Sequence, residues 1–214
     1  MDLRELNFKL TKESLKKETS RDILIIQTIH TIDELIKIIN TLVANLRERY
    51  GYYAPRISKT EDVEKFLELV NEKNKEDLGL DLDDKDLNSI IEISNEIKKL
   101  INFKNQQEKY LQELTKEICP NLDQVATTLI AARLIDHAGS IKHLAEIPSS
   151  TIQVLGAEKA LFRHLKTGSK APKFGIIFSH PNISKSPQEN KGKTARKLAS
   201  EISKAVKIDF FRKK

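Results

Sequence analysis

The chain has 214 residues, of which 32% are charged and 39% are hydrophobic, a length that suits one large domain or two small ones. It has one Cys, one Met and no Trp, which excludes a disulfide framework and a zinc site built on several cysteines. No apolar run reaches the roughly 18 residues of a membrane span, and we expect no secretory signal in the acid-containing first residues. A reducing, cytoplasmic setting is the expectation.

The net charge of +6 is divided unevenly along the chain. Residues 121–214 hold 17 Lys and Arg against 7 Asp and Glu, a net charge of +10. Residues 1–120 hold 20 against 24, a net charge of −4. A basic carboxyl-terminal half is typical of a protein that binds a polyanion, most often a nucleic acid, although a solvated basic surface is the alternative.

The first 119 residues predict two long helices with matched heptad seams. Apolar residues recur in steps of three and four along both segments. The first seam comprises Ile25, Ile29, Ile32, Ile36, Ile39, Val43, Leu46 and Tyr50. The second comprises Ile90, Ile93, Ile97, Leu100, Lys104, Gln107, Leu111, Leu114 and Ile118, with Lys104 and Gln107 as its two polar members. Together they predict an antiparallel coiled-coil hairpin over residues 1–119.

Residues 51–89 are expected to form the helical tip of this hairpin. Thr60 is a candidate N-cap for a short helix, and Asp84 or Asp86 for the second long one. Four aromatic residues form either the small core of the hairpin end or a surface for self-association: Tyr50, Tyr52, Tyr53 and Phe66. The acidic run after Gly79 lacks the central Gly and terminal Glu of a calcium loop.

After Cys119 the chain reads as short helices with ordered turns, because five of six prolines and five of seven glycines lie there. Asn121 or Asp123 is a candidate cap for the first of them, and Gly139 is expected to end a helix. Cations then recur on one side of a helix that starts near Gly156, and others cluster where a final amphipathic helix begins, a suitable place for phosphate. These cations are Lys159, Arg163 and Lys166, then Lys185, Lys191, Lys193, Arg196 and Lys197.

Three motifs for chemistry are excluded. Gly192-Lys193-Thr194 ends like a phosphate-binding loop, but proline occupies position 187, where the first glycine would be required. His137, His143, His164 and His180 lack metal-ligand spacing, so no metal site or cofactor is expected. Cys119 is expected in the core, and with no catalytic arrangement in the sequence we expect no enzyme.

From Asn121 to Asp209 the sequence resembles a Nop domain. The resemblance rests on LIAARLIDHAGSIKHLAEIPSSTIQVLGAEKALFRHL, on APKFGIIFSHP and on KGKTARKLASEISKAVKID. The segment SRDILIIQTIHTIDELIKIINTLVANLRERYGYYAP is similar to the first coiled-coil helix and aromatic tip of the same proteins. The most similar type of member is the archaeal Nop-family scaffold of box C/D small ribonucleoproteins, whose guide RNAs direct 2′-O-methylation.

The resemblance implies an all-α fold, with a coiled-coil hairpin over 1–119, a Nop domain over 120–209 and a basic tail over 210–214. It also implies a noncatalytic assembly protein that dimerises through the coiled coil. The partners implied are a kink-turn guide RNA and the small kink-turn-binding protein already bound to it. In this family a separate amino-terminal domain holds the methyltransferase fibrillarin. No such domain is recognised in this sequence, which leaves direct binding of fibrillarin by this chain open.

Candidate site residues follow from chemistry and resemblance together. Gly156 would allow close approach of a partner protein and Glu158 would pair with its cations, within the partner surface Gly156, Ala157, Glu158 and Phe162. His180 would stack on an unpaired base. The predicted RNA contacts are Lys159, Arg163, Ser179, His180, Lys185, Gln188, Lys191, Lys193 and Arg196. A protein-only dimeric module with a basic helical head is the alternative function.

Overall fold

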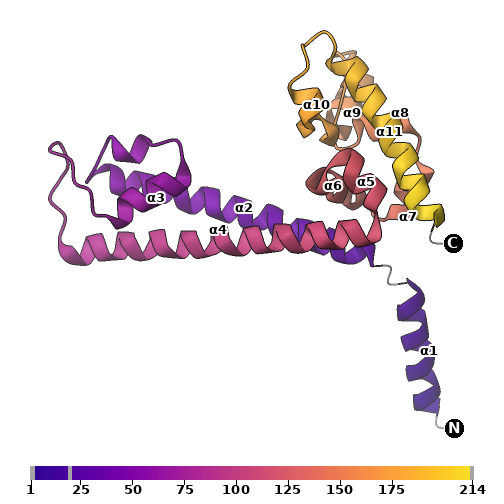
Figure 1. The fold of residues 1–214 in the computed structure, drawn as a ribbon, viewed down its shortest axis with the longest axis horizontal. Coiled ribbons are helices and arrows are strands. Elements are labelled where there is room, and N and C mark those ends of the chain that lie inside the picture. The colour runs from indigo at the N-terminus through magenta and orange to yellow at the C-terminus, as the bar shows by residue number, and fades with distance from the viewer. Residues whose placement is uncertain (1–2, 19–20, 213–214) are drawn as a thin grey trace. The chain divides into compact units, whose positions relative to one another are not determined.

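The computed structural model describes residues 3–18 and 21–212, and these form two compact units that are considered separately. Within the described residues there are helices and turns but no strand (Figure 1), so the predicted all-α class is confirmed. One unit, the hairpin unit, comprises residues 30–109, and the other, the head unit, comprises residues 1–29 and 110–214. None of the described helices is long and apolar enough to cross a membrane.

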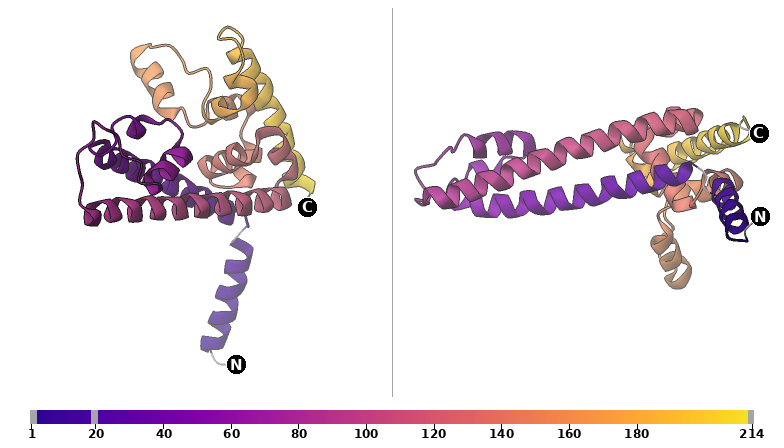
Figure 2. Two further views of the ribbon diagram at one scale, coloured as in Figure 1. Left: turned by 60° about the vertical axis from the view of Figure 1, so that its left-hand side comes forward. Right: turned by 90° about the horizontal axis from the view of Figure 1, so that it is seen from below.

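Two long helices account for most of the first half, as the heptad seams predict. α2 spans Asp22–Gly51 and α4 spans Asp84–Ile118, and they run side by side in opposite directions (Figures 1 and 2). In the hairpin unit most seam residues of the two helices lie in one buried cluster, among them Ile39 and Val43 of α2 and Ile90 and Ile97 of α4, while Ile36 is only half-buried. The apolar stripe of each helix is thereby removed from water, which is the main term that holds such a pair together.

The two polar seam positions remain inside the seam rather than turning away from it. Lys104 and Gln107 are both half-buried. The Lys104 ammonium lies 3.2 Å from a carboxylate oxygen of Glu108, one turn further along α4. This ion pair supplies the charged group with a partner, as a partly desolvated cation requires.

The tip of the hairpin is closed by an aromatic core. α3 spans Val63–Asn71 and a short 3-10 turn, η1, spans Ile57–Lys59. The N-cap of α3 is Asp62, whose carboxylate accepts from the backbone N–H groups of Glu64 and Lys65, so the expectation that Thr60 caps this helix is wrong. Tyr50, Tyr53 and Phe66 are buried there and only Tyr52 of the four predicted aromatic residues is exposed.

Because of Tyr50, the stability of the hairpin unit is expected to decrease at alkaline pH. Its hydroxyl donates to the carbonyl oxygen of Asn74 at 2.7 Å, and burial, with smaller contributions from Tyr53 and Glu76, raises the pKa of Tyr50 from 10.0 to about 12. A raised pKa favours the folded state fully below pH 10, and this contribution is lost as the pH rises towards 12. We expect a loss of roughly 2–3 kcal/mol over that range.

The measurement is urea unfolding of the wild type and of Tyr50→Phe in the same alkaline buffers. At neutral pH the variant should be about 1 kcal/mol less stable, because the hydrogen bond to Asn74 is lost. Above pH 10 the gap should close and then reverse, since phenylalanine does not ionise. Parallel pH curves for the two proteins would contradict the assignment.

The head unit is built from short helices packed on one long helix. α5 (Pro120–Ala126), α7 (Ile141–Glu146) and α8 (Ser149–Val154) all pack against α11 (Lys191–Arg212), and α6 (Thr128–Ala138) packs against α5 and α7. α9 (Glu158–Thr167), η2 (Ile176–Ser179) and α10 (Pro181–Ser184) complete the region. α1 (Leu3–Glu18) and the adjoining ends of α2 and α4 also belong to this unit.

The predicted domain of residues 120–209 lies wholly within the head unit, and α11 continues through Arg212 into the predicted tail. Residues 213–214 of that tail lie outside the described residues. The compact units thus separate within the long helices, at residues 29/30 and 109/110.

Two buried carboxylates hold the head unit together by capping helices from a distance. Asp209 of α11 accepts from the backbone N–H groups of Asn121 and Leu122, at 3.2 and 2.8 Å, and from the Asn121 side chain at 2.6 Å. Asp22 of α2 accepts from the N–H of Ile141 at the start of α7, at 2.9 Å. Each carboxylate satisfies donors that a helix start leaves without an intrahelical partner. The expectation that Asn121 or Asp123 caps α5 is wrong, because Asp209 performs this role.

Candidate nucleic-acid interface

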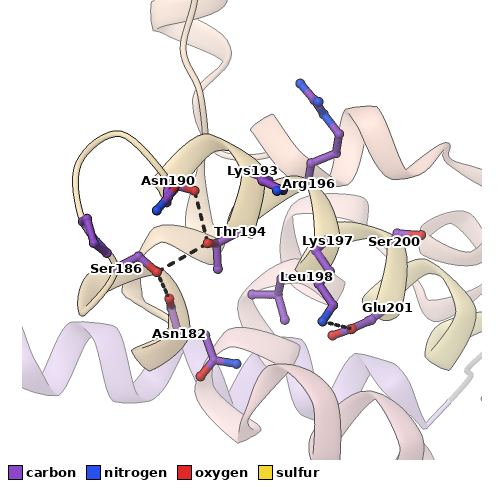
Figure 3. A pocket seen from close by; sticks show the side chains of 11 residues that line it. Asn182, Ser186, Asn190, Lys193, Thr194, Arg196, Lys197, Leu198, Ser200 and Glu201 are labelled. Atoms are coloured by element: carbon purple, nitrogen blue, oxygen red, sulfur yellow. Dashed lines mark hydrogen bonds and ion pairs between the residues drawn. The ribbon is translucent and has the colours of Figure 1, made fainter.

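A groove lined mainly by polar and charged residues runs beside the first turns of α11. Its volume is about 860 Å³, and Figure 3 shows its lining side chains. They come from α10, from the turn that follows it and from α11: Asn182, Ser186, Pro187, Asn190, Lys193, Thr194, Arg196, Lys197, Leu198, Ser200 and Glu201. The 3.6-residue period of α11 places its members at spacings of three and four on one side of the helix.

The groove carries cations that the protein itself does not neutralise. Within the described part of the chain, Lys193 and Arg196 have no acidic side chain within ion-pair distance, and both are exposed. Lys197 lies 3.9 Å from Glu201, four residues further along α11. Exposed ammonium and guanidinium groups on one helix face are suited to phosphate oxygens, and the guanidinium can bind them in bidentate fashion.

Hydrogen bonds around Thr194 fix the part of the groove where the turn after α10 meets α11. The Thr194 N–H and hydroxyl both donate to the carbonyl oxygen of Asn190, at 2.9 and 3.1 Å. The hydroxyls of Ser186 and Thr194 lie 3.4 Å apart (Figure 3), and Ser186 in turn donates to the carbonyl of Asn182. These contacts fasten the turn after α10 to the start of α11, so the cations project from a rigid frame.

The predicted RNA contacts are only partly brought together. Lys193 and Arg196 line the groove, and Lys191 begins the same helix. Lys185 and Gln188 are exposed in the turn before it, while Ser179 donates its hydroxyl to the carbonyl of Ile176 at 2.9 Å. Lys159 and Arg163 are exposed on α9, a separate helix. Sequence reasoning missed several groove residues, namely Asn182, Ser186, Asn190, Thr194 and Ser200, although the helical spacing of Thr194 and Ser200 from Lys197 was a usable signal.

His180 is placed differently from an open stacking residue. Only 6% of it is exposed. Its Nδ1 accepts from the backbone N–H of Asn182 at 3.2 Å and thereby caps α10. This bond fixes the tautomer, because the accepting nitrogen carries no proton. In the free protein the ring therefore has a structural role, and base stacking on it stays a prediction.

The predicted surface for a partner protein lies on α9. None of its residues is buried, and Phe162 and Leu165 are 68% and 71% exposed. Both views of Figure 2 show this helix set apart from the other helices of the head unit. Ala157 is the N-cap residue before it, and Glu158 accepts from the N–H of Gly156 at 2.6 Å.

Gly156 is required by a contact inside the chain. Its φ is +84°, and a Cβ there would lie 2.5 Å from Cγ1 of Ile176. Both the left-handed backbone and the close approach exclude a larger residue. Packing of η2 against the start of α9 is thus one reason for this glycine, and close approach of a partner protein at Gly156 stays a prediction.

No group of three or more potential metal ligands occurs among the residues that the structure describes. Cys119 is buried at the end of α4, in line with the expected core position.

Comparisons with known proteins point in one direction. Residues 68–214 match a family model described as "Nop: snoRNA binding domain, fibrillarin". An uncharacterized NOP5 family protein of Methanocaldococcus jannaschii is 37% identical over 229 residues, which cover 94% of this chain and 55% of that protein. Nucleolar protein 56 of Schizosaccharomyces pombe is 34% identical over 222 residues, 89% of this chain and 45% of its own length. The chain thus spans about half the length of these relatives.

The fold has a counterpart among solved structures. The chain is similar to one in a crystal structure of a fibrillarin/Nop5p complex, with a TM-score of 0.59 and 26% identity. The match covers 99% of this chain and 70% of that one. Both long helices and the head unit therefore fall within the aligned part.

Proposed function

Since the chain belongs to the Nop family, we propose that it is a noncatalytic RNA-binding protein of box C/D ribonucleoprotein particles, with the groove on α11 as an RNA contact. The observation that carries the proposal is the pair of exposed, unneutralised cations, Lys193 and Arg196, over a hydrogen-bonded polar wall. Such a frame binds phosphates without selecting a sequence. Specificity must then come from added contacts.

A kink-turn RNA that already carries its small binding protein would supply those contacts. The basic surface alone offers about five or six phosphate contacts, which gives affinity in the micromolar range or weaker at physiological salt. Phe162 and Leu165 on α9 present exposed apolar surface that a protein can cover, and apolar patches of this kind mark protein interfaces. We infer that α9 contacts the protein component and α11 the RNA component.

The test is a mobility-shift titration with a kink-turn RNA, with and without its small binding protein. The chain should bind the preformed RNA–protein complex at least about tenfold more tightly than the RNA alone, since apolar contacts on α9 are then added. Phe162→Ser should abolish this gain and leave binding to free RNA unchanged. Equal affinity for the two targets would contradict the composite site.

Two substitutions of His180 separate its role as the N-cap of α10 from its predicted role in base stacking. His180→Ala removes both the ring and the N-cap of α10, whereas His180→Asn removes the ring and keeps an acceptor that is favoured at N-caps. If a base stacks on the ring, both variants should lose about 1–3 kcal/mol of RNA-binding free energy with an unchanged salt slope. Only His180→Ala should also lower the melting temperature of the head unit. Wild-type RNA affinity in His180→Asn would show that the ring acts only as a cap.

Self-association through the tip of the hairpin unit is a further part of the proposal. With Tyr50, Tyr53 and Phe66 buried, the exposed apolar side chains there are Tyr52, Leu78 and Leu80. The N–H of Leu80 donates to the carbonyl of Tyr52 at 2.8 Å, which holds these two residues together. We name Tyr52, Leu78 and Leu80 the tip patch. Because adjacent exposed apolar residues favour a partner surface, we propose that a second copy covers the tip patch.

Sedimentation of the full chain at tens of micromolar, a range in which weak dimers populate, checks this prediction. The wild type should sediment as a dimer, and a Leu78→Lys/Leu80→Lys double variant as a monomer. Phe162→Ser, which alters an equally exposed apolar residue on α9, should remain dimeric. A monomeric wild type would overturn the proposal.

The alternative, a protein-only module with a basic head, makes the opposite prediction for RNA. Its basic residues would form only a solvated face, so the kink-turn RNA would bind no better than an unrelated duplex. Titrations with the kink-turn RNA and with the duplex at several salt concentrations discriminate between the two functions. Phosphate contacts make the logarithm of the affinity fall with the logarithm of the salt concentration, with a slope set by the number of contacts.

A further inference from the structure

An aromatic stack lies next to the start of α11. The rings of Phe174 and Phe178 are nearly parallel, with planes 12° apart and centroids 4.6 Å apart. Phe178 is 41% exposed, whereas its neighbour Ile177 is fully buried and anchors η2. Ile177 thus anchors the segment in the core of the head unit, and the exposed part of the Phe178 ring is available to a ligand.

The stack is held in place by contacts of its backbone. Gly175 lies between Phe174 and Phe178 in sequence. Its N–H donates to the carbonyl of Gln153 at 2.9 Å, and the N–H of Ile176 donates to the carbonyl of Leu155 at 2.8 Å. The side-chain amide of Gln153 donates to the carbonyl of Lys173 at 2.7 Å. A Cβ on Gly175 would lie 1.9 Å from the Leu155 carbonyl oxygen, so the segment passes α8 too closely for any other residue. The rings are thus preorganised rather than placed on a loose turn.

A cation sits over the same ring. The ammonium of Lys191, the first residue of α11, lies 5.0 Å from the centroid of Phe178, within the range of a cation–π contact. Because Phe174 occupies one face of Phe178, the ammonium marks the other face. The ring face that attracts the ammonium can also stabilise a flat, electron-poor group such as a base. The Lys191 ammonium is close enough to that face to pair with a phosphate of the same ligand.

We propose that Phe178 is a stacking platform for one unpaired RNA base, and that Lys191 leaves the ring face to pair with the phosphate of the same nucleotide. The inference rests on the proposed function, since it assumes that RNA binds at α11, and adds a residue that reads unpaired structure. Stacking on an aromatic side chain is how single-stranded nucleotides are commonly bound. The site is distinct from His180, whose ring is buried as a helix cap.

The experiment compares two RNAs at protein concentrations of tens of micromolar, suited to non-specific binding. One is a stem-loop with the fluorescent base 2-aminopurine in its unpaired loop, and the other is a fully paired duplex. With the wild-type chain, the fluorescence should be quenched on binding. Phe178→Leu should weaken stem-loop binding by roughly 5-fold to 150-fold, abolish the quench and leave duplex affinity unchanged. Phe178→Tyr should behave as the wild type.

Two controls separate the possible failures. Phe211→Leu changes another exposed ring, which lies near the carboxyl end of α11 and is 61% exposed, and it should alter neither RNA affinity nor quench. Lys193→Ala/Arg196→Ala should weaken binding of both RNAs. If Phe178→Leu binds and quenches the stem-loop like the wild type, the platform is wrong while RNA binding at α11 stands. If the wild type binds neither RNA, the proposed function fails and this inference fails with it.

Discussion

Replacing Phe66 by Ala is expected to lower the free energy of unfolding of the hairpin unit by about 3–5 kcal/mol. Phe66 is fully buried. Its ring meets Tyr50 edge-on, with centroids 6.2 Å apart, and the Arg47 guanidinium lies 4.7 Å from its centroid. Truncation therefore opens a cavity and also removes an aromatic pair and a cation–π contact.

Urea unfolding measures the loss of stability, and hydrogen exchange shows whether the loss is confined to the hairpin unit. Residues 30–109 should lose protection in Phe66→Ala, while α5–α11 of the head unit should lose little. Phe103→Ala is the matched control, because Phe103 lies on α4 of the same unit with nearly half of its surface exposed, and it should cost less than about 1 kcal/mol. Equal losses for the two variants would show that Phe66 does not organise the tip.

Replacing Lys191, Lys193 and Arg196 together by Ala is expected to have the largest effect on RNA binding. Three phosphate contacts would be lost, so the log–log slope of affinity against salt should flatten by roughly 2 to 3 units. At low salt the affinity should fall by roughly one to two orders of magnitude, with the difference shrinking as salt rises. Filter binding or fluorescence anisotropy over a salt series measures both quantities.

The same helix offers a control of equal charge. Lys204, Lys207 and Arg212 are exposed near the other end of α11, and their replacement by Ala removes the same three charges. This variant should keep most of the slope if binding is local to the groove. If the two triple variants lose the same amount, the attraction is a property of the net charge of the head unit, and the groove is a solvated surface.

The long helices were predictable because their information is local and repeated. Each heptad adds apolar residues on one side of the helix, so a polar seam residue such as Lys104 does not alter the prediction. Helix starts were less predictable. Ser140 caps α7 locally by accepting from the His143 N–H, but the N–H groups of Asn121 and Ile141 are satisfied by Asp209 and Asp22, 88 and 119 residues away in sequence. Sequence rules for capping consider only neighbours.

Some residues of the candidate site were predictable from the sequence and others were not. Lys193 and Arg196 were found because cations gather visibly at the start of a predicted helix. The burial of His180 and the exposure of Phe178 were not predictable, because they depend on which of two rings close in sequence is turned into the core. A Nδ1 acceptor that caps α10 and an aromatic neighbour at Phe174 decide this, and neither contact follows from residue type.

The carboxylate of Asp209 ties the order of synthesis to the order of folding. As the chain emerges from a ribosome, α5 appears long before α11. The N–H groups of Asn121 and Leu122 have no acceptor until Asp209, nearly ninety positions later, has been synthesised. Closure of the head unit is therefore a late event that also delivers the groove on the same helix. A nascent chain should acquire protease resistance of the head unit and the groove on α11 in a single step rather than in succession.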